Sequence, residues 1–254
     1  MEIGAVKELA LCYSIFSFIE GEDAKTLMPE WTKEVQYMIG LEAGKDHARM
    51  HLYQAPKIIK PWYERALKKH EQYVKAYQTC EVKISSNDKI FQFIDGNLGI
   101  IKNRPNQLQH DDFHLENIIV KDKRYNGVID FNGYDWGDPN HDIVKIALFR
   151  REISIPFSIG QIIGYFNQKI PEDFWRLYAI YVAMTLFFSI VWSIKAGISV
   201  ADEMMERLHV VLEDHKNFEL EKPGFGLYEV KKWSVVKKEM DQYSKKRIFM
   251  ETHV

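Results

Sequence analysis

The chain of 254 residues is poor in cysteine and has no excess of either charge. Its two cysteines, Cys12 and Cys80, form no C-x-x-C pair, which excludes a disulfide scaffold and a cysteine zinc site. This usage fits a reducing compartment, so we expect a cytoplasmic location. The 36 acidic residues nearly balance the 34 basic ones, and the global charge therefore does not indicate a nucleic-acid partner.

Long hydrophobic runs are also scarce. The uncharged stretch from Leu177 to Ile194 just reaches the length of a membrane span, but it contains hydroxyl side chains and stands alone. We therefore interpret it as a buried core helix and expect no membrane partner. The run from Leu9 to Ile19 is not interpreted as a signal peptide, because its upstream flank has no net positive charge and no small-residue cleavage site follows.

The patterns that are present predict an α+β fold that is mostly helical. Apolar spacing predicts helices in four stretches: from Pro29 to His51, from Pro61 to Thr79, from Asp88 to Lys102, and from Asp142 onward. The aromatic run from Leu9 to Ile19 predicts one strand ending in a turn.

One β-hairpin is expected in the middle of the helical body. Two short apolar runs, Ile118–Val120 and Gly127–Ile129, flank a polar segment that ends in Asn126-Gly127. Asn-Gly readily adopts the positive backbone angles of a tight hairpin turn. We therefore expect the turn at this dipeptide, with the motifs on either side of the hairpin at the rim of a cleft.

The residues that indicate chemistry lie on both sides of this hairpin. His110, Asp112 and Asn117 fit the spacing H-x-D-x-x-x-x-N, and Asp130 follows the second hairpin strand. Phosphoryl transfer needs a carboxylate that positions the acceptor hydroxyl and divalent ions that neutralise the phosphates. Kinases meet both needs with such a loop and with an Asp just past the next strand.

Two segments resemble the aminoglycoside phosphotransferases, a family of antibiotic and small-molecule kinases. HDDFHLENIIV is similar to their H-G-D-x-H-x-x-N loop, and VIDFNGYDWGDPNHDI is similar to the segment that follows it. The resemblance implies a protein-kinase-like C-terminal lobe whose small β-hairpin carries the catalytic loop and the metal-binding Asp. It also implies ATP or GTP with Mg²⁺ as cofactors, a small-molecule hydroxyl acceptor, and a link to antibiotic resistance.

The resemblance implies roles for five residues of these segments. Asp112 would be the catalytic base, His110 would brace the loop, and His114 would lie beside the acceptor pocket. Asn117 and Asp130 would bind magnesium, which prefers oxygen ligands.

Other positions follow from the same resemblance. YSIFSFIEGEDA is similar to the strand and hinge of the family, so Ser17, Phe18 and Ile19 would offer backbone groups to the nucleotide base. Asp138 and Asp142 match acidic positions that look structural, and Asp138-Pro139 could equally be a plain helix start. Asp111 stands where the family most often has Gly.

A metal-dependent phosphohydrolase is the rival from another chemistry. His110-Asp111 and His141-Asp142 are His-Asp pairs, and His47 and His51 have the i, i+4 spacing of helical metal ligands. Ala48 stands where a zinc-protease motif needs Glu. Helical His-Asp hydrolases also do not need a strand–turn–strand unit between their metal ligands. We interpret His47 and His51 as an ordinary helix face.

The front of the chain does not match a complete kinase. The residues before Tyr13 contain no Gly-rich loop, and Lys7 has no strand context to act as a phosphate lysine. We divide the chain into a remnant of the N-terminal lobe and hinge (1–24), the catalytic lobe (25–228) and a basic helical extension (229–254). A fragment, a degenerate binding remnant and a separately supplied lobe all stay open, and we expect weak or no activity from this chain alone.

The acceptor is not determined by the sequence. The family suggests an aminoglycoside or another cationic or polyhydroxylated compound. A few acidic positions on the later helices could attract a cation, although such charges are usually a solvated face: Glu172, Asp173, Asp202, Glu203 and Glu206.

Overall fold

The computed structural model describes residues 2–149 and 153–224, and a mostly helical α+β fold with small sheets is present in this part of the chain. The predicted extension 229–254 lies outside these residues. The longer helices are α2 (Lys33–Met50), α3 (Trp62–Thr79), α4 (Asn87–Asn97), α7 (Ile155–Tyr165), α8 (Phe174–Ala196) and α9 (Ile198–Asp214). Shorter helices are α1 (Ala24–Leu27), α5 (Pro139–Ile143) and α6 (Lys145–Phe149).

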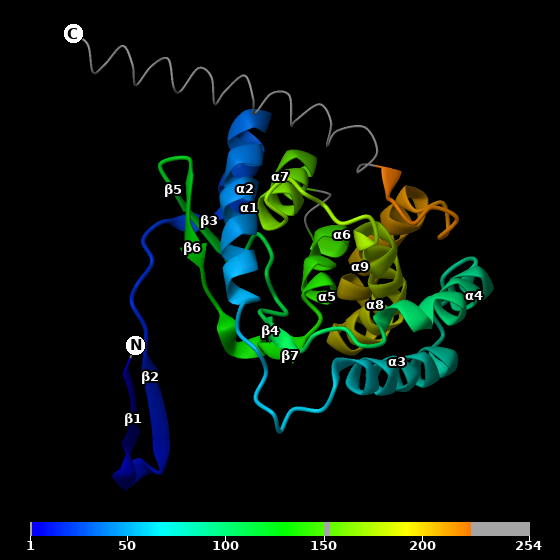
Figure 1. Ribbon diagram of the computed structural model, residues 1–254, viewed down its shortest axis with the longest axis horizontal. Helices are drawn as coiled ribbons and strands as arrows, with labels where there is room; N and C mark the ends of the chain where they lie inside the picture. The colour runs from blue at the N-terminus through cyan, green and yellow to red at the C-terminus, as the bar shows by residue number, and fades with distance from the viewer. Residues whose placement is uncertain (1, 150–152, 225–254) are drawn as a thin grey trace.

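Three small sheets accompany these helices. Strands β1 (Glu2–Val6) and β2 (Leu11–Ile15) form an antiparallel hairpin that stands apart from the helical body (Figure 1). Strand β5 (Ile118–Lys121) pairs with both β3 (Glu22–Asp23) and β6 (Arg124–Val128). Strands β4 (Gln107–Gln109) and β7 (Asp135–Gly137) pair on the other side of the catalytic segment.

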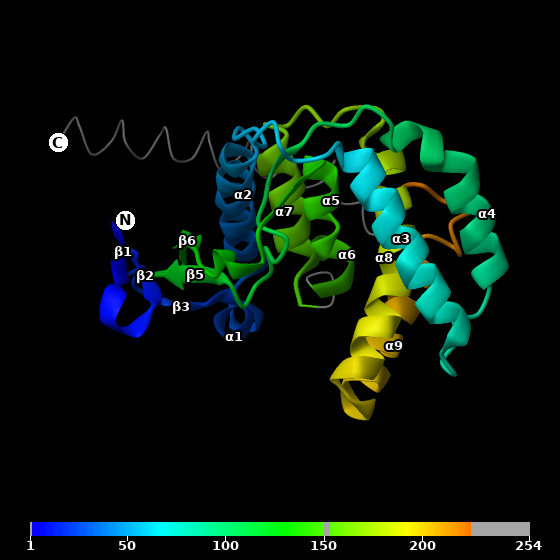
Figure 2. The ribbon, with the colours of Figure 1, turned by 90° about the horizontal axis from the view of Figure 1, so that it is seen from below.

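Helix α8 is the centre of the larger hydrophobic core, as its uncharged sequence predicts. It is long and apolar enough to cross a membrane by length and composition, yet 72% of its most apolar window is buried inside the structure. Aromatic side chains from α3, α4 and α8 meet there, with Phe91 and Phe187 stacked at a centroid distance of 4.6 Å. Figure 2 shows α3 and α4 along one side of α8, with α9 also packed against it.

A second core joins α2 to the central hairpin. Ile39 and Ala43 of α2 pack with Phe113, Ile118 and Val128, all buried. Because Phe113 belongs to the predicted catalytic loop, this core fixes that loop to a helix some 70 residues earlier in the chain.

Helices α2 and α7 lie side by side at very close range (Figures 1 and 2). Each helix carries two glycines four residues apart, Gly40 and Gly44 on α2 and Gly160 and Gly164 on α7. A Cβ atom on Gly44 would lie 2.1 Å from the carbonyl oxygen of Gln161. No larger side chain fits at these crossings, so the glycines set the spacing of the two helices.

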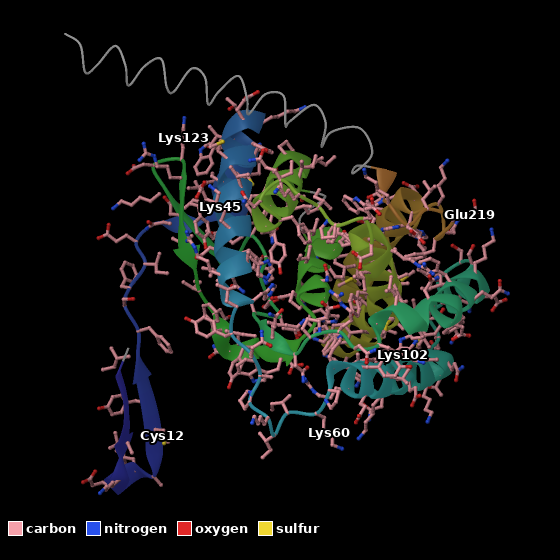
Figure 3. The ribbon with its side chains drawn as sticks, viewed as in Figure 1. Cys12, Lys45, Lys60, Lys102, Lys123 and Glu219 are labelled. Atoms are coloured by element: carbon pink, nitrogen blue, oxygen red, sulfur yellow. The ribbon has the colours of Figure 1, made fainter. Side chains whose placement is uncertain are left out.

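The predicted hairpin is present, but the predicted position of its turn is wrong. The turn is formed by Asp122 and Lys123, which have φ angles of 50° and 59°, and Figure 3 shows Lys123 at the tip. Asn126 and Gly127 lie within β6 instead. The Ile19 side chain packs over Gly127, where a Cβ would lie 2.8 Å from its Cδ1 atom, so this glycine serves packing and not the turn.

Two predicted boundaries at the front of the chain are also wrong. The segment from Leu9 to Ile19 is not one strand, because Ala10 turns the chain in a left-handed conformation and only Leu11–Ile15 pair. The helix expected from Pro29 begins at Lys33, where the Thr32 hydroxyl accepts a hydrogen bond from the Val35 backbone N–H. Pro29 belongs to a 3-10 turn, Met28–Glu30, that precedes it.

Candidate active site

The predicted catalytic loop lies between β4 and β5 and folds back on itself. The His114 backbone N–H donates to the Asp112 carbonyl at 2.9 Å, and the Asn117 N–H donates to the His114 carbonyl at 3.0 Å. Asp111 has a φ of 57°, a left-handed conformation that Asp tolerates better than most residues other than Gly. This backbone angle explains why Gly is the usual residue at this position.

Asp142 holds the backbone of the catalytic loop in place. Its carboxylate is completely buried and accepts hydrogen bonds from the backbone N–H groups of His110, at 2.8 Å, and Asp111, at 2.9 Å. The imidazoles of His47 and His51 bind the same carboxylate, with Nε2 to Oδ2 distances of 2.8 and 3.2 Å. Asp142 is thus a structural residue, as its position in the family motif implies.

The interpretation of His47 and His51 as an ordinary helix face is wrong. Both side chains are buried, and His47 also stacks on Phe113 at a centroid distance of 4.1 Å. Their ring nitrogens and an Asp142 oxygen lie within 4.8 Å of one another, the arrangement of a metal-ligand triad. Because Asp142 already accepts backbone N–H groups from the loop, the two histidines complete a buried hydrogen-bonded anchor.

The electrostatics of this anchor follow from its contacts. Burial by itself raises the pKa of Asp142, but the charges and hydrogen bonds of His47 and His51 outweigh it and hold the pKa well below the usual range. The carboxylate therefore stays ionised at neutral pH. The i, i+4 histidine spacing was visible in the sequence, but their partner lies more than 90 residues away.

His110 joins the loop to the segment after β6 that contains Asp130. Its Nε2 lies 3.0 Å from the Ile129 carbonyl oxygen, and its Nδ1 lies 3.3 Å from the Asp112 backbone nitrogen. These partners match a neutral imidazole that donates through Nε2 and accepts through Nδ1. His110 therefore links the loop to the segment after β6, and its role as a brace in catalysis stays a prediction.

Asp112 projects from this loop with 45% of its side chain exposed. The Nε2 atom of His114 lies 3.2 Å from its Oδ1 atom. That hydrogen bond is the largest influence on the carboxyl, and together with nearby positive charge it lowers the pKa of Asp112 despite partial burial. An ionised, accessible carboxylate can accept a hydrogen bond from a hydroxyl group.

Asn117 directly precedes β5, and Asp130 lies two residues after the end of β6. The Asn117 amide donates to the Asp112 carbonyl at 2.9 Å, and the Ile129 backbone N–H donates to the Asn117 carbonyl at 2.9 Å. The side-chain oxygen of Asn117 is then the atom it can offer to a cation. Asp130 is exposed and has a φ of 65°, and its Oδ1 accepts from the Asn132 side chain at 2.8 Å.

The donor set at this point consists of oxygen atoms from two carboxylates and an amide. Such hard donors suit Mg²⁺, whereas Zn²⁺ and copper favour imidazole or thiolate. Of these groups, the Asn117 amide oxygen and the Asp130 carboxylate fit a magnesium ion that keeps part of its water shell.

The predicted hinge residues lie in an irregular segment between β2 and β3. Ser17 and Phe18 are exposed, Phe18 to 86%, and Ile19 packs against Gly127 of β6. Among the described residues, Ser17 and Phe18 form no backbone–backbone hydrogen bond. Their role toward a nucleotide base stays a prediction.

A cavity of about 570 Å³, here called the catalytic cleft, opens beside Asp112 and His114 and reaches α8 and α9. Two ion pairs line it, Lys25 with Glu116 and Arg207 with Glu203. The cleft is large enough for a small organic molecule. Phe188 and Trp192 give it an apolar side opposite the catalytic loop.

Comparison with known proteins agrees with this geometry. No curated protein sequence matches the chain. Solved structures of similar fold include the ADP-bound aminoglycoside phosphotransferase APH(2'')-Ib, at 15% identity and a TM-score of 0.53, covering 76% of this chain and 69% of that one. The GDP complex of wild-type aminoglycoside 2'-phosphotransferase-IIIa has 13% identity and a TM-score of 0.56, with 85% and 74% covered.

A third structure holds both a nucleotide analogue and an acceptor. A thermostable mutant of APH(4)-Ia, in a ternary complex with AMP-PNP and hygromycin B, has 18% identity and a TM-score of 0.58, with 84% and 75% covered. At these identities the likeness shows the fold. The profile of the phosphotransferase enzyme family APH matches residues 3–178, which is most of the chain and includes the whole catalytic segment. The chain belongs to this phosphotransferase family.

Proposed function

We propose that this chain transfers the terminal phosphoryl group of ATP or GTP to a hydroxyl group of a small molecule, with Mg²⁺. The single observation that carries the proposal is the arrangement of the catalytic segment: Asp112 lines the catalytic cleft, Asn117 donates to the Asp112 carbonyl, and Asp130 follows β6, next to Ile129, which is hydrogen-bonded to Asn117. An ionised carboxylate, an amide oxygen and a second carboxylate there are the groups that phosphoryl transfer requires.

Asp112 has the central role in the proposed reaction. Its carboxylate would accept the hydrogen bond of the acceptor hydroxyl and direct the oxygen toward the phosphorus, because positioning contributes much of the catalysis in phosphoryl transfer. His114 and Asn117 hold the carboxylate through hydrogen bonds. The low pKa of Asp112 keeps it in the accepting form at neutral pH.

Asn117 and Asp130 would hold the metal ion. When bound, Mg²⁺ neutralises phosphate oxygens and so lowers the charge that the acceptor oxygen meets. His110 and Asp142 would act as positioning residues. Their hydrogen bonds hold the backbone of the catalytic loop and of Ile129, and so would fix the positions of Asp112 and Asp130. The relatives with ADP, GDP and AMP-PNP support ATP or GTP as donor.

A binding remnant without turnover is the second candidate, and one observation favours it. In the described part of the chain before the hinge, Lys7 is the single lysine, and it lies in the 3-10 turn at the tip of the β1–β2 hairpin. That tip points away from the helical body (Figure 1). If no lysine of this segment reaches the nucleotide phosphates, transfer by this chain is expected to be slow.

A thermal-shift measurement tests the proposed site. Mg²⁺ with ATP or GTP is expected to raise the melting temperature of the chain, and Asp130→Ala is expected to remove the Mg²⁺-dependent part, because binding to the folded state stabilises it. Asp88→Ala, an exposed carboxylate on α4, is the matched control and should keep the full shift. An equal shift in Asp130→Ala and in the unaltered chain would refute the assigned metal site.

A further inference from the structure

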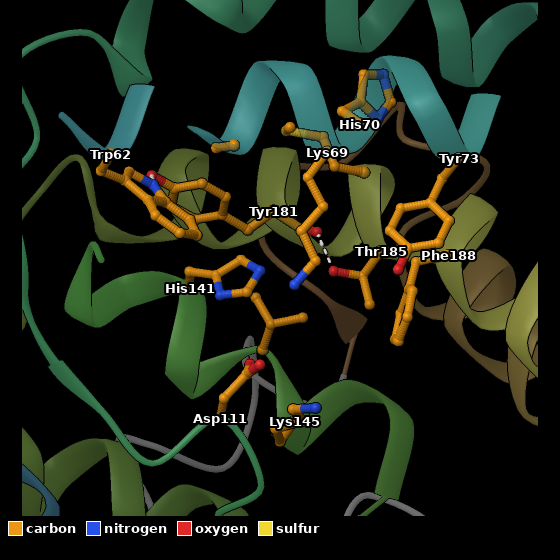
Figure 4. Close-up of a pocket in the computed structure, with 13 residues that line it drawn as sticks. Trp62, Lys69, His70, Tyr73, Asp111, His141, Lys145, Tyr181, Thr185 and Phe188 are labelled. Carbon is orange, nitrogen blue, oxygen red and sulfur yellow. Dashed lines mark hydrogen bonds between the residues drawn. The ribbon is translucent and has the colours of Figure 1, made fainter. Parts of the chain in front are cut away.

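A second, smaller cavity adjoins the catalytic cleft between α3 and α8, and it is here called the aromatic pocket. Its volume is about 80 Å³, enough for a small ring or a short alkyl group. Figure 4 shows its walls, which come mainly from four aromatic side chains: Trp62, Tyr73, Tyr181 and Phe188. It shares four lining residues with the catalytic cleft: Asp111, Lys145, Thr185 and Phe188.

The shared residues make the two cavities one continuous site. A molecule whose hydroxyl group meets Asp112 in the catalytic cleft can extend its body past Asp111 and Phe188 into the aromatic pocket. The pocket therefore belongs to the acceptor side of the reaction. Its apolar walls are suited to a ring or alkyl group, because burying such a group between aromatic side chains is favourable.

One wall of the pocket is held rigidly. The Trp62 indole N–H donates to the Tyr181 hydroxyl at 2.9 Å, and that hydroxyl donates to the buried Asp138 carboxylate at 2.8 Å. Arg104 pairs with the same carboxylate at 2.7 Å. Because this network fixes the orientation of Trp62 and Tyr181, the pocket keeps its shape before a ligand enters, which lowers the cost of binding.

The charges that face the pocket are two lysines and one carboxylate: Lys69, Lys145 and Asp111. Burial lowers the pKa of His70 and of His141, so both lining histidines are neutral at pH 7. The pocket thus has one more positive than negative charge, in a chain whose net charge is negative.

Lys69 is the cation whose charge is available to a ligand. Among the described residues Lys69 forms no ion pair, and its amino group lies over the ring of Phe188, 5.8 Å from the ring centroid. Figure 4 shows the amino group pointing into the pocket between His141 and Thr185. An anionic group of a ligand in the pocket would meet it directly.

We infer that the acceptor is a hydroxyl compound with an apolar or aromatic body and one anionic group, and that Lys69 binds this group. The inference rests on the proposed phosphotransferase function and names its substrate class. Lys69 is then a specificity-determining residue, while Asp112 stays the residue that meets the hydroxyl group.

The same charges disfavour a polycation as acceptor. Gentamicin and hygromycin B, which accompany relatives of this fold, are amino-group compounds, and their ammonium groups would face Lys69 and Lys145. Among the described residues that line the catalytic cleft, Glu203 is the one acidic position of the later helices that the sequence analysis named. It pairs with Arg207. Among the described residues that line the aromatic pocket, Asp111 is the one carboxylate, and a cationic acceptor would meet Lys69 and Lys145 beside it.

Three probes that share a benzyl alcohol and differ in charge test the inference. We would titrate the full chain, with Mg²⁺ and a non-hydrolysable ATP analogue, with para-(hydroxymethyl)benzoate, para-methylbenzyl alcohol and para-(aminomethyl)benzyl alcohol, and record binding by ligand-observed NMR. Kanamycin serves as the polycation. The benzoate is expected to bind at least about tenfold more tightly than the amine.

Matched lysine variants assign the effect to one residue. Lys69→Ala is expected to reduce the affinity for the benzoate by about tenfold and to leave the neutral alcohol unchanged, and Lys69→Arg should restore it. Lys68→Ala is the control, because Lys68 is an exposed residue of the same helix, α3, and lies outside the pocket. Equal benzoate affinity in Lys69→Ala and the unaltered chain, no benzoate binding, or tighter binding of the amine or kanamycin would overturn the inference.

The same samples separate this inference from the proposed function. A nucleotide-dependent thermal shift without charge-selective probe binding would overturn the acceptor class and leave the phosphotransferase site standing. Charge-selective probe binding without any nucleotide effect would support the pocket assignment and count against the phosphoryl-transfer function.

Discussion

At the scale of single residues, the catalytic loop depends on side chains that the local pattern does not reveal. The positions of His110, Asp112 and Asn117 could be predicted because their spacing is short and typical of kinases. The pairing of His47 and His51 with Asp142 could not, because it joins a helix to a loop across more than 90 residues. A hydrogen bond over that separation leaves no local periodicity.

The His114 contact gives a prediction about pH. The hydrogen bond from His114 stabilises the ionised form of Asp112, so its removal in His114→Asn is expected to raise the pKa of Asp112 toward the ordinary aspartate value. The sign follows because a depressed pKa keeps the carboxylate charged to lower pH. Carboxyl-carbon NMR of Asp112 during an acid titration measures the midpoint directly.

The control for this titration is His209→Asn, an exposed histidine on α9. That variant should leave the Asp112 midpoint unchanged. A midpoint that is the same in His114→Asn and in the unaltered chain would show that His114 does not set the charge of the catalytic carboxylate.

At the scale of elements, the predicted bounds of a helix or strand match the structure where contacts between neighbouring residues in the sequence determine them. Helix α3 was predicted with nearly its true bounds, from Pro61 to Thr79, because its apolar residues recur at helical spacing. The hairpin turn was misplaced, because Asn126-Gly127 favours a turn locally but Gly127 is required under Ile19. Strand β1 (Glu2–Val6) was missed, since it pairs only with β2 and its sequence alternates weakly.

The crossing of α2 and α7 gives a prediction about stability. Gly44→Ala would place a methyl group 2.1 Å from the Gln161 carbonyl, so the helices must separate, and we expect a loss of about 2–4 kcal/mol in the free energy of unfolding. Gly96→Ala, on α4 with no atom within 4 Å of the added Cβ, should instead stabilise the chain by about 0.4–1 kcal/mol.

Urea unfolding of both variants measures these differences on one scale. The comparison is matched because both changes are Gly to Ala within a helix. If Gly44→Ala were as stable as Gly96→Ala, the glycines would not set the spacing of α2 and α7, and the account of how α2 positions the catalytic loop would need revision.

At the scale of the whole molecule, the helical body contains the proposed phosphoryl-transfer site, and the hairpin β1–β2 stands apart from it (Figure 1). Leu11, Ile15 and Phe16 of that region are largely exposed. The family and fold could be predicted from the sequence, because two motif segments carry them. The acceptor class could not, because the aromatic pocket joins α3, α8 and the catalytic loop, which are distant in the chain.

The most direct test of the central claim is the rate at which the full chain releases or transfers the labelled terminal phosphate of ATP or GTP in the presence of Mg²⁺. We expect slow transfer that requires Mg²⁺. The rate should fall by about 100-fold or more in Asp112→Asn and Asp130→Ala and should be unchanged in Asp88→Ala. Transfer that is the same in all four proteins, or absent in the unaltered chain, would contradict the claim that these residues form a phosphoryl-transfer site.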